Sequence, residues 1–343
     1  MTRIGTYGFL NAKVRTMRSF LLTSRMYRSL IEARDLREMS SLLSQTIYQD
    51  ALRNSDQKDP IEIEQILLYE EIVRLKKIEK YSQSMPKQIM RWFLERYDCE
   101  KLKILLRLWH KKSEKETELL RWKILYDFPV KEILLAQNLS DIALLLNESP
   151  FQEPLAQAIS AYNEKRTLFP VELSLDKFLF EDVRNMMKTM SREDRRIARQ
   201  LLGIEVDLKN LDWLSRFKEY YKIPAAEIGQ MLLSSGYHLS LDTLREVITS
   251  GNYSKAFSTI TKGFDIPSGE ESSEKAALEM IEKILYQILL EKAEKAFTQF
   301  PFSIGAIFGY FYLIRIETRN IRTLIHAKFY HLPSQTVESL LVM

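Results

Sequence analysis

The stretch IGAIFGYFYLIRIETRNIR, residues 304–322, contains the pattern that decides the fold. From Ile304 to Ile316 it holds one charge, Arg315, and it then turns strongly polar. A membrane span needs roughly 20 apolar residues, so this segment is too short to cross a bilayer. Positions three and four apart share a face of a helix, which places Glu317 within an apolar stripe. We therefore expect a helix buried in a protein core and carrying a buried carboxylate.

The composition of the 343-residue chain favours helix and gives little sign of a charged ligand. The chain is 45% hydrophobic and 28% charged, and it contains 10 Gly and 10 Pro residues. So few helix breakers, together with abundant Leu, Ile, Glu, Lys and Arg, favour long uninterrupted helices. The formal net charge of +4 is too small for this length to indicate binding to nucleic acid or anionic lipid.

Cysteine usage and the N-terminus both indicate the cytoplasm. Cys99 is the only cysteine, so no disulfide can form within the chain, and a reducing compartment is the simpler interpretation. Residues 1–10 lack the charged-then-apolar pattern of a signal peptide. Because the 304–316 segment is the best candidate for a span and is too short, we expect a chain that does not cross a membrane.

Apolar residues recur at helical spacing along most of the chain, and no alternating run is convincing enough to predict a strand. The predicted helices are Ala12–Ile31, Ile61–Tyr81, Lys87–Trp109, Leu175–Lys188, Leu208–Tyr221, Ala276–Phe297 and Ile304–Tyr330. The predicted breaks are Asn54–Pro60, Asp127–Pro129, Ser149–Pro154, Ile223–Pro224 and Gly263–Glu271. The sequence therefore predicts an all-α fold.

A first sequence landmark occurs three times. It is a short helix that begins at Leu and reaches an aromatic residue followed by a short polar pair. The copies are LREMSSLLSQTIYQDAL from Leu36, LSDIALLLNESPFQEPL from Leu139 and, with a gap of three residues, LREVITSGNYSKAF from Leu244. Their aromatic residues are Tyr48, Phe151 and Tyr253.

A second landmark follows each copy of the first, in DCEKLKILLR, DLKNLDWLSR and ETRNIRTLIH. It places an acid in an apolar stripe, with an amide three residues later and a basic residue nine residues later. The acids are Asp98, Asp207 and Glu317; the amides are Asn210 and Asn320, with Lys101 at that place in the first copy; the basic residues are Arg107, Arg216 and His326. Both landmarks recur at intervals of about 103 to 110 residues. This repeat predicts three tandem pseudo-symmetric helical units at residues 1–125, 126–235 and 236–343.

The repeated acids need partners, because burying an unpartnered ionised carboxylate costs several kcal/mol. The basic residue of each landmark lies roughly 13 Å along the same helix, too far for direct pairing, so we expect basic groups or backbone donors, from another helix. The acids could be polar pins that fix helix register, or the polar clusters could converge on one surface that grips a partner. Acid–base catalysis is disfavoured, because catalytic pairs normally occupy two different environments.

The usual sequence signs of an enzyme are missing. Neither a GxxxxGK[ST] phosphate loop nor a GxGxxG motif occurs. The four histidines are scattered and Cys99 has no companion, so we expect no metal site and no cofactor. The densest basic patch, SREDRRIARQ at residues 191–200, is typical of a solvated helix start with Ser191 as cap and Asp194 in the first turn. Without an aromatic platform it does not indicate nucleic-acid binding.

Three segments resemble the C subunits of V-type and A-type rotary ATPases, the family that includes the eukaryotic d subunit. They are YGFLNAKVRTMRSFLLTSRMYRSLI from Tyr7, GIEVDLKNLDWLSRFKEYYKIP from Gly203 and YLIRIETRNIRTLIHAKFYHLPSQTVESLLV up to Val342. The resemblance covers Tyr7 to Val342, and Lys101 departs from it. It implies a funnel-shaped, all-helical socket built from three pseudo-symmetric units.

The same resemblance implies a non-catalytic rotor subunit, present in one copy per complex and peripherally attached to the cytoplasmic face of a membrane. Such a subunit would connect the central stalk to the proteolipid ring and transmit torque, without cofactor, nucleic acid or small-molecule substrate. The family has no catalytic residues to transfer to this chain. The residues themselves leave other classes open: a soluble helical adaptor or scaffold unrelated to a membrane rotor, a nucleic-acid-binding regulator, or a hydrolase built on the repeated carboxylates.

Overall fold

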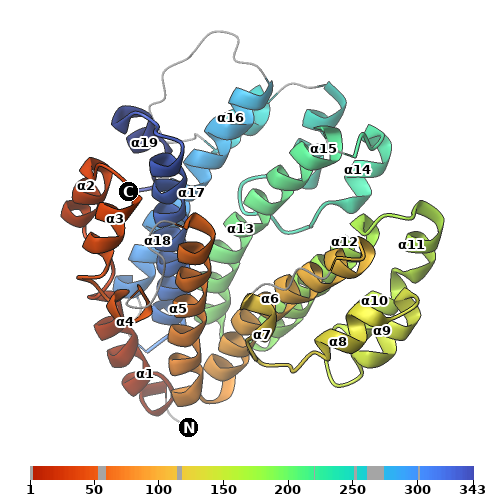
Figure 1. Cartoon of the computed structure of the whole chain (residues 1–343), viewed down its shortest axis with the longest axis horizontal. Coiled ribbons are helices and arrows are strands. Elements are labelled where there is room, and N and C mark those ends of the chain that lie inside the picture. Colours follow the sequence, from red (N-terminus) through yellow and green to blue (C-terminus); the bar gives the residue numbers. More distant parts are fainter. Residues whose placement is uncertain are drawn as a thin grey trace. The chain divides into compact units, whose positions relative to one another are not determined.

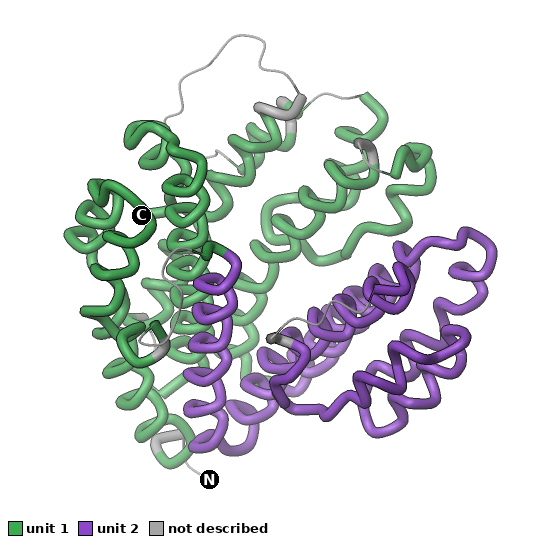
Figure 2. Tube along the Cα trace, viewed as in Figure 1, with its two compact units in different colours: residues 1–60, 190–343 green, residues 61–189 purple. Residues whose placement is uncertain are grey.

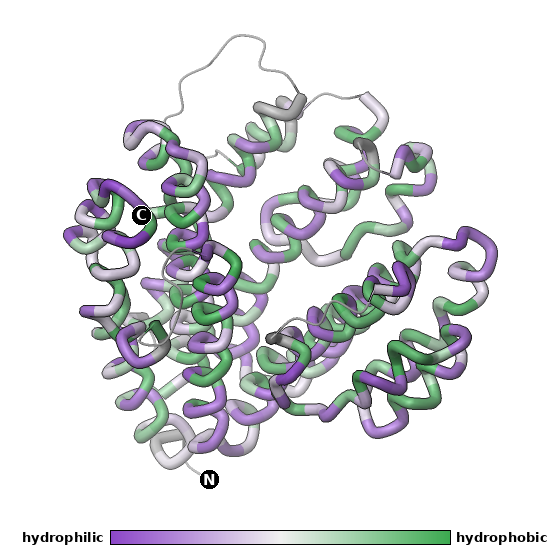
Figure 3. The backbone as a smooth tube through the Cα atoms, viewed as in Figure 1, coloured by the Kyte–Doolittle hydropathy of each residue, from purple (hydrophilic) through white to green (hydrophobic). Residues whose placement is uncertain are grey.

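The computed structural model describes residues 3–52, 59–113, 118–219, 221–250, 253–260, 274–299 and 302–343. Within these ranges every regular element is a helix and no strand is present. The predicted all-α fold is therefore confirmed. Figure 3 shows apolar residues recurring along the long helices with polar residues between them, as expected for helices that bury one face.

The chain divides into two compact units, which Figure 2 draws in different colours. We call residues 1–60 together with 190–343 the terminal unit, and residues 61–189 the middle unit. This division follows the compactness of the fold, so it does not test the division into three units that the sequence repeat predicts. The three units at residues 1–125, 126–235 and 236–343 therefore stay a prediction.

The terminal unit combines helices from both ends of the chain (Figure 1). They are α1 (Arg3–Arg18), α2 (Ser24–Glu32), α3 (Leu36–Leu43), α4 (Gln49–Leu52), α13 (Arg192–Glu219), α14 (Ala225–Met231), α15 (Leu241–Ser250), α16 (Ser254–Ile260), α17 (Glu274–Gln299), α18 (Gly305–Phe329) and α19 (Ser334–Leu340). Helix α17 packs against both α13 and α18, while α1 and α3 contact α18 and α2 contacts α19. The N-terminal helices thus pack against the C-terminal ones.

Helix α18 is the core of the terminal unit, and two glycines bring it close to α17. A Cβ on Gly305 would lie 2.5 Å from the carbonyl oxygen of Ala296, and one on Gly309 would lie 2.6 Å from that of Ala293. Any side chain at these positions would push the two helices apart. The apolar segment that begins at Ile304 is therefore buried by protein, as predicted. None of the helices in the described ranges is long and apolar enough to span a membrane.

The middle unit is a second helical core. Its helices are α5 (Pro60–Tyr81), α6 (Ser84–His110), α7 (Glu118–Arg121), α8 (Val130–Leu135), α9 (Leu139–Leu145), α10 (Gln152–Gln157), α11 (Ile159–Lys165) and α12 (Phe169–Thr189). Phe151 is fully buried, and its ring makes edge contacts with Tyr126, Phe128 and Phe178. The single cysteine, Cys99, is buried in the same cluster, which explains it as a core residue.

Most long helices lie where the apolar spacing predicts them. The predictions Ile61–Tyr81, Lys87–Trp109, Leu175–Lys188, Ala276–Phe297 and Ile304–Tyr330 correspond to α5, α6, α12, α17 and α18. The prediction Leu208–Tyr221 found only the C-terminal half of α13, which begins at Arg192. The predicted loop Gly263–Glu271 lies outside the described residues.

Two predicted boundaries are wrong for local reasons. The single helix predicted at Ala12–Ile31 is broken between α1 and α2, because the Thr23 hydroxyl caps α2 and the Leu22 N–H donates to a side chain in α18. Within the predicted break Ser149–Pro154, helix α10 already begins at Gln152 and includes Pro154. Proline is tolerated there because the first turn of a helix needs no intrahelical N–H donor.

Candidate functional site

The first repeated acid, Asp98, lies fully buried on α6 in the middle unit. Its Oδ2 accepts the backbone N–H groups of Leu125 at 2.9 Å and Tyr126 at 3.3 Å. Its Oδ1 is buried and has no hydrogen-bond partner. Burial raises the pKa of Asp98 to about 7, although the two N–H groups act in the opposite direction. This carboxyl group therefore holds one short backbone segment with one oxygen.

The second acid, Asp207, lies fully buried on α13 and uses both oxygens. Oδ2 accepts the N–H groups of Tyr237 at 3.1 Å and His238 at 2.7 Å, and Oδ1 accepts that of Leu239 at 3.1 Å. Burial raises the pKa of Asp207 to about 7 against these three donors. A Cβ on Gly236 would lie 2.1 Å from Oδ1, so the loop can reach the carboxylate only with glycine there.

The third acid, Glu317, lies on α18 with only 3% of its surface exposed. Its Oε2 accepts the N–H of Leu22 at 2.5 Å, and its Oε1 accepts the hydroxyl proton of Tyr48 at 2.7 Å. Burial, and then the charge of Glu317, raises the pKa of Tyr27 well above its usual range. Glu317 thus holds a segment that is 295 residues away in the chain.

The residue three positions after each acid also bonds to backbone. Asn210 donates to the carbonyl oxygen of Leu233 at 2.9 Å and accepts its N–H at 2.8 Å. Asn320 forms the same pair of bonds with Val342, at 2.7 and 3.0 Å. These partners lie 23 and 22 residues after their amides. At the corresponding place in the first copy, Lys101 donates to the carbonyl oxygen of Trp122 at 2.8 Å, 21 residues on.

The chain reaches these partners by a similar path in two copies. Pro224 and Pro333 each precede a short helix, α14 and α19, with closely similar backbone angles, φ −57° and ψ 139° against φ −60° and ψ 142°. Each short helix ends in an extended residue, Leu232 or Leu341, directly before the residue that the amide binds. The repeat therefore includes the connection after the long helix as well as the polar positions on it.

The expected backbone donors are present, but the expectation that they come from another helix is wrong. Leu22, Tyr48, Leu125 and residues 237–239 all lie outside helices. The reason is that backbone N–H groups inside a helix are already bonded to carbonyl groups four residues earlier, whereas N–H groups between helices need an acceptor. The buried carboxylates supply those acceptors.

The basic residues of the second landmark lie away from the acids and are exposed. Arg107 forms a two-pronged ion pair with Glu172, at 2.6 and 2.9 Å. Arg216 pairs with Asp212 one turn earlier, at 2.9 Å. The His326 ring stacks on Tyr330. The structure therefore joins each acid, and the amide or lysine three residues after it, to backbone, and leaves the basic residues in separate surface contacts.

Asp194, predicted to lie in a solvated helix start, is instead buried, with 4% of its surface exposed. Ser191 does cap the helix, accepting the Asp194 N–H at 3.2 Å. The Asp194 carboxylate accepts hydrogen bonds from the hydroxyls of Ser191 and Tyr7, and from the N–H of Ile304 at 2.9 Å. Sequence reasoning missed this fourth link between distant segments. Its only sequence signal was the spacing of Ser191 and Asp194.

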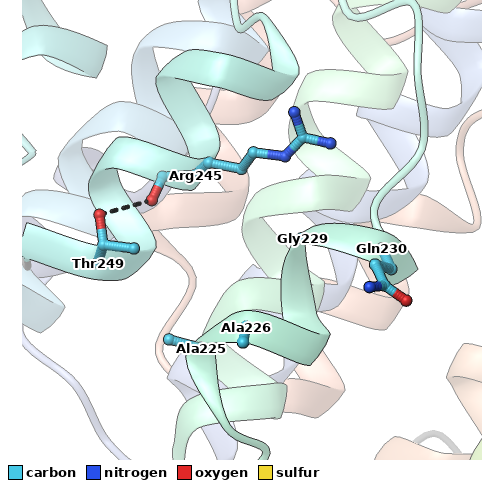
Figure 4. A pocket seen from close by; sticks show the side chains of 6 residues that line it. All are labelled: Ala225, Ala226, Gly229, Gln230, Arg245 and Thr249. Atoms are coloured by element: carbon cyan, nitrogen blue, oxygen red, sulfur yellow. Dashed lines mark hydrogen bonds between the residues drawn. The ribbon is translucent and has the colours of Figure 1, made fainter.

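A pocket of about 290 Å³ lies between α14 and α15 in the terminal unit, and Figure 4 shows its lining side chains. They are Ala225, Ala226, Gly229, Gln230, Arg245 and Thr249. None of the repeated acids lines it. Among the described residues, no group of His, Cys, Asp and Glu is arranged to hold a metal ion. The repeated acids bond to backbone groups and do not lie in the wall of this pocket.

The family model described as ATP synthase (C/AC39) subunit matches residues 10–340. The chain belongs to this family. Three similar archaeal proteins all carry the name of the C subunit of A-type ATP synthase. The protein of Methanocaldococcus jannaschii is 25% identical, over 99% of this chain and 87% of its own length. That of Methanococcoides burtonii is 23% identical, over 98% and 94%, and that of Methanobrevibacter smithii is 23% identical, over 93% and 83%.

Membership of the C/AC39 family defines the class of function. The chain is a non-catalytic subunit of a rotary ATPase, and its partners are other subunits of that complex. The resemblance found in the sequence is therefore confirmed. A hydrolase built on Asp98, Asp207 and Glu317 does not agree with this family.

Proposed function

We propose that this protein links the central stalk of the rotary ATPase to the proteolipid ring and transmits torque between them. One copy per complex would lie on the cytoplasmic face of the membrane, attached through its protein partners. The observation that carries the proposal, beyond family membership, is the repeated use of a buried carboxylate to fix backbone between helices. A connector under torsional load must resist shear, and such links stiffen the segments that helical packing alone would leave loose.

We further propose that three pseudo-symmetric units form this connector as a funnel-shaped socket. The matching contacts of Asp98, Asp207 and Glu317 support the repeat, as do the matching paths through α14 and α19. In the third unit, the N-terminal segment supplies the backbone that the other units supply locally. Tyr48, from the first landmark, donates to Glu317 of the last one. On this proposal, Leu22 and Tyr48 of the first predicted unit hold Glu317 of the third.

The test is a pull-down of the tagged full-length chain from its own membranes in mild detergent, with quantitative mass spectrometry of all retained proteins. We expect stalk, ATPase head and proteolipid subunits, with this chain at one copy per complex. An untagged strain provides the background.

Two other outcomes would contradict the proposal. Recovery of soluble partners without any proteolipid would make the chain an adaptor. Recovery of the ring in a stoichiometry of several copies of this chain would exclude a single central connector.

A further inference from the structure

A row of arginines lies on one face of α13, near its start. Arg192, Arg195, Arg196 and Arg199 are all exposed, and we call them the Arg row. Their spacing of three and four residues places them on one side of the helix, over a length of about 10 Å. Together with Gln200 and Tyr237 they line a surface hollow of about 440 Å³. The terminal unit thus presents four guanidinium groups to one hollow.

One contact of the Arg row is local, since Arg195 donates to the carbonyl oxygen of Met190 at 3.1 Å. Like charges three and four residues apart destabilise a helix, and cations near a helix N-terminus oppose the helix dipole. Of the two acids in the same turn, Glu193 supplies a single negative charge against four positive ones. The other, Asp194, is buried and accepts bonds from Tyr7, Ser191 and Ile304. Four cations on one face of a helix repel one another, and an anionic partner would relieve that repulsion.

The wall of the hollow is held in place by the second repeated acid. Tyr237 donates its N–H to Asp207, and its hydroxyl accepts a hydrogen bond from Gln200 at 3.2 Å. On the opposite side of α13, Ile197, Ala198 and Leu201 are buried in the core. The surface is consequently preorganised, which lowers the ordering cost of binding.

We propose that the Arg row docks an acidic helix of another subunit of the rotary complex. Guanidinium groups bind carboxylates through paired hydrogen bonds. A single phosphate would need donors that converge on one point, whereas these four are exposed and spread along a line. Carboxylates spaced three and four residues apart on a partner helix match that line. This inference rests on the proposed function for the identity of the complex, but it concerns a separate surface.

The first experiment reverses the charge of the row in the full-length chain. Complexes retained by the variant Arg192→Glu/Arg196→Glu/Arg199→Glu are washed with increasing salt. The control is Arg25→Glu/Arg28→Glu/Arg37→Glu, which changes the net charge equally at exposed positions on α2 and α3. We expect the Arg-row variant to bind its complex about tenfold more weakly or worse, and the control to remain near wild type. Equal retention of both variants would overturn the inference.

The second experiment identifies the partner. In Arg196→Lys the charge is kept, and a carbodiimide can couple the new amine to any carboxylate in contact with it. We expect a cross-link to an Asp or Glu in a helical segment of another subunit, found by mass spectrometry. Absence of any cross-link in an intact complex would overturn the inference. If wild-type chain retained no ATPase subunit at all, the proposed function itself would have failed.

A membrane surface is the competing occupant. To test this alternative, the wild-type chain and the triple Arg-row variant are each sedimented with vesicles of phosphatidylglycerol, which is anionic, and of phosphatidylcholine, which has no net charge. Sedimentation with the anionic vesicles that is lost in the variant would assign the row to lipid and overturn the proposal. Equal, weak sedimentation of both proteins is the result that we expect.

Discussion

The terminal unit and the middle unit both carry the repeated acid, but the acid and the residue three positions after it make more hydrogen bonds in the terminal unit. In the terminal unit, Asp207 and Glu317 each use both oxygens, and their amides pair twice with a buried backbone residue. In the middle unit, Asp98 uses one oxygen, and Lys101 makes one bond where the amides make two. Lysine has donors but no acceptor, so it cannot hold the N–H of the residue whose carbonyl it binds.

This difference indicates that the repeated acid has a structural role. If the acid were there for chemistry, the three copies would share charged or ligand-facing surroundings. They share backbone partners instead, and the copy that has Lys101 in place of an amide also makes carboxyl-to-backbone bonds. The terminal unit also relies on the position over a longer range, since Glu317 holds residues from the other end of the chain. We therefore expect substitutions to cost more in the terminal unit.

The largest effect is expected for Glu317→Ala. It removes two hydrogen bonds to a carboxylate and leaves the Leu22 N–H without its acceptor, so the free energy of unfolding should fall by at least about 3 kcal/mol. Urea unfolding followed by circular dichroism measures it. Tyr48→Phe removes one of the two bonds and should cost clearly less, about 1 to 2 kcal/mol.

Asp98→Ala is the matched substitution in the middle unit. A loss as large as that of Glu317→Ala would break the comparison, because it would show that one engaged oxygen stabilises as much as two. An unchanged unfolding curve for Glu317→Ala, with weaker retention in the complex, would instead place Glu317 at a subunit interface.

Much of this fold could be predicted from the sequence, because apolar spacing is a local property. The apolar stripe around Glu317 and the three-residue spacing from Asp207 to Asn210 could both be recognised from the local sequence. The partners were not. Every residue except proline has a backbone N–H, so Leu22 and His238 carry no sequence sign of being held by a buried carboxylate. The break between α1 and α2 was missed for the same reason, since a contact from α18 causes it.

We expect an intermediate effect on the free energy of unfolding when Asp207→Asn is compared with Asp98→Asn. In Asp207→Asn, one accepting oxygen becomes an NH₂ group that faces a backbone donor, so we expect a loss of about 2 to 3 kcal/mol. In Asp98→Asn, the amide oxygen can accept from Leu125 and Tyr126 while the NH₂ replaces an oxygen without a partner. That variant should lose less than about 1 kcal/mol. Chemical unfolding at neutral pH tests both, and equal losses would contradict the difference in their bonding.

The smallest effect is a change in pH dependence. The pKa of Asp98 rises from 3.8 to about 7 on folding, so the native state binds a proton more tightly than the unfolded chain does. Its contribution to stability is therefore complete below pH 3.8 and is lost as the pH rises towards 7. Asp98→Asn removes this contribution, and its unfolding free energy should fall less steeply than that of wild type over that range. Because Asp207 shifts in the same direction, part of the slope should remain. Identical slopes would mean that Asp98 stays ionised over this range and holds Leu125 and Tyr126 as an anion, which would contradict the raised pKa of this buried carboxyl group.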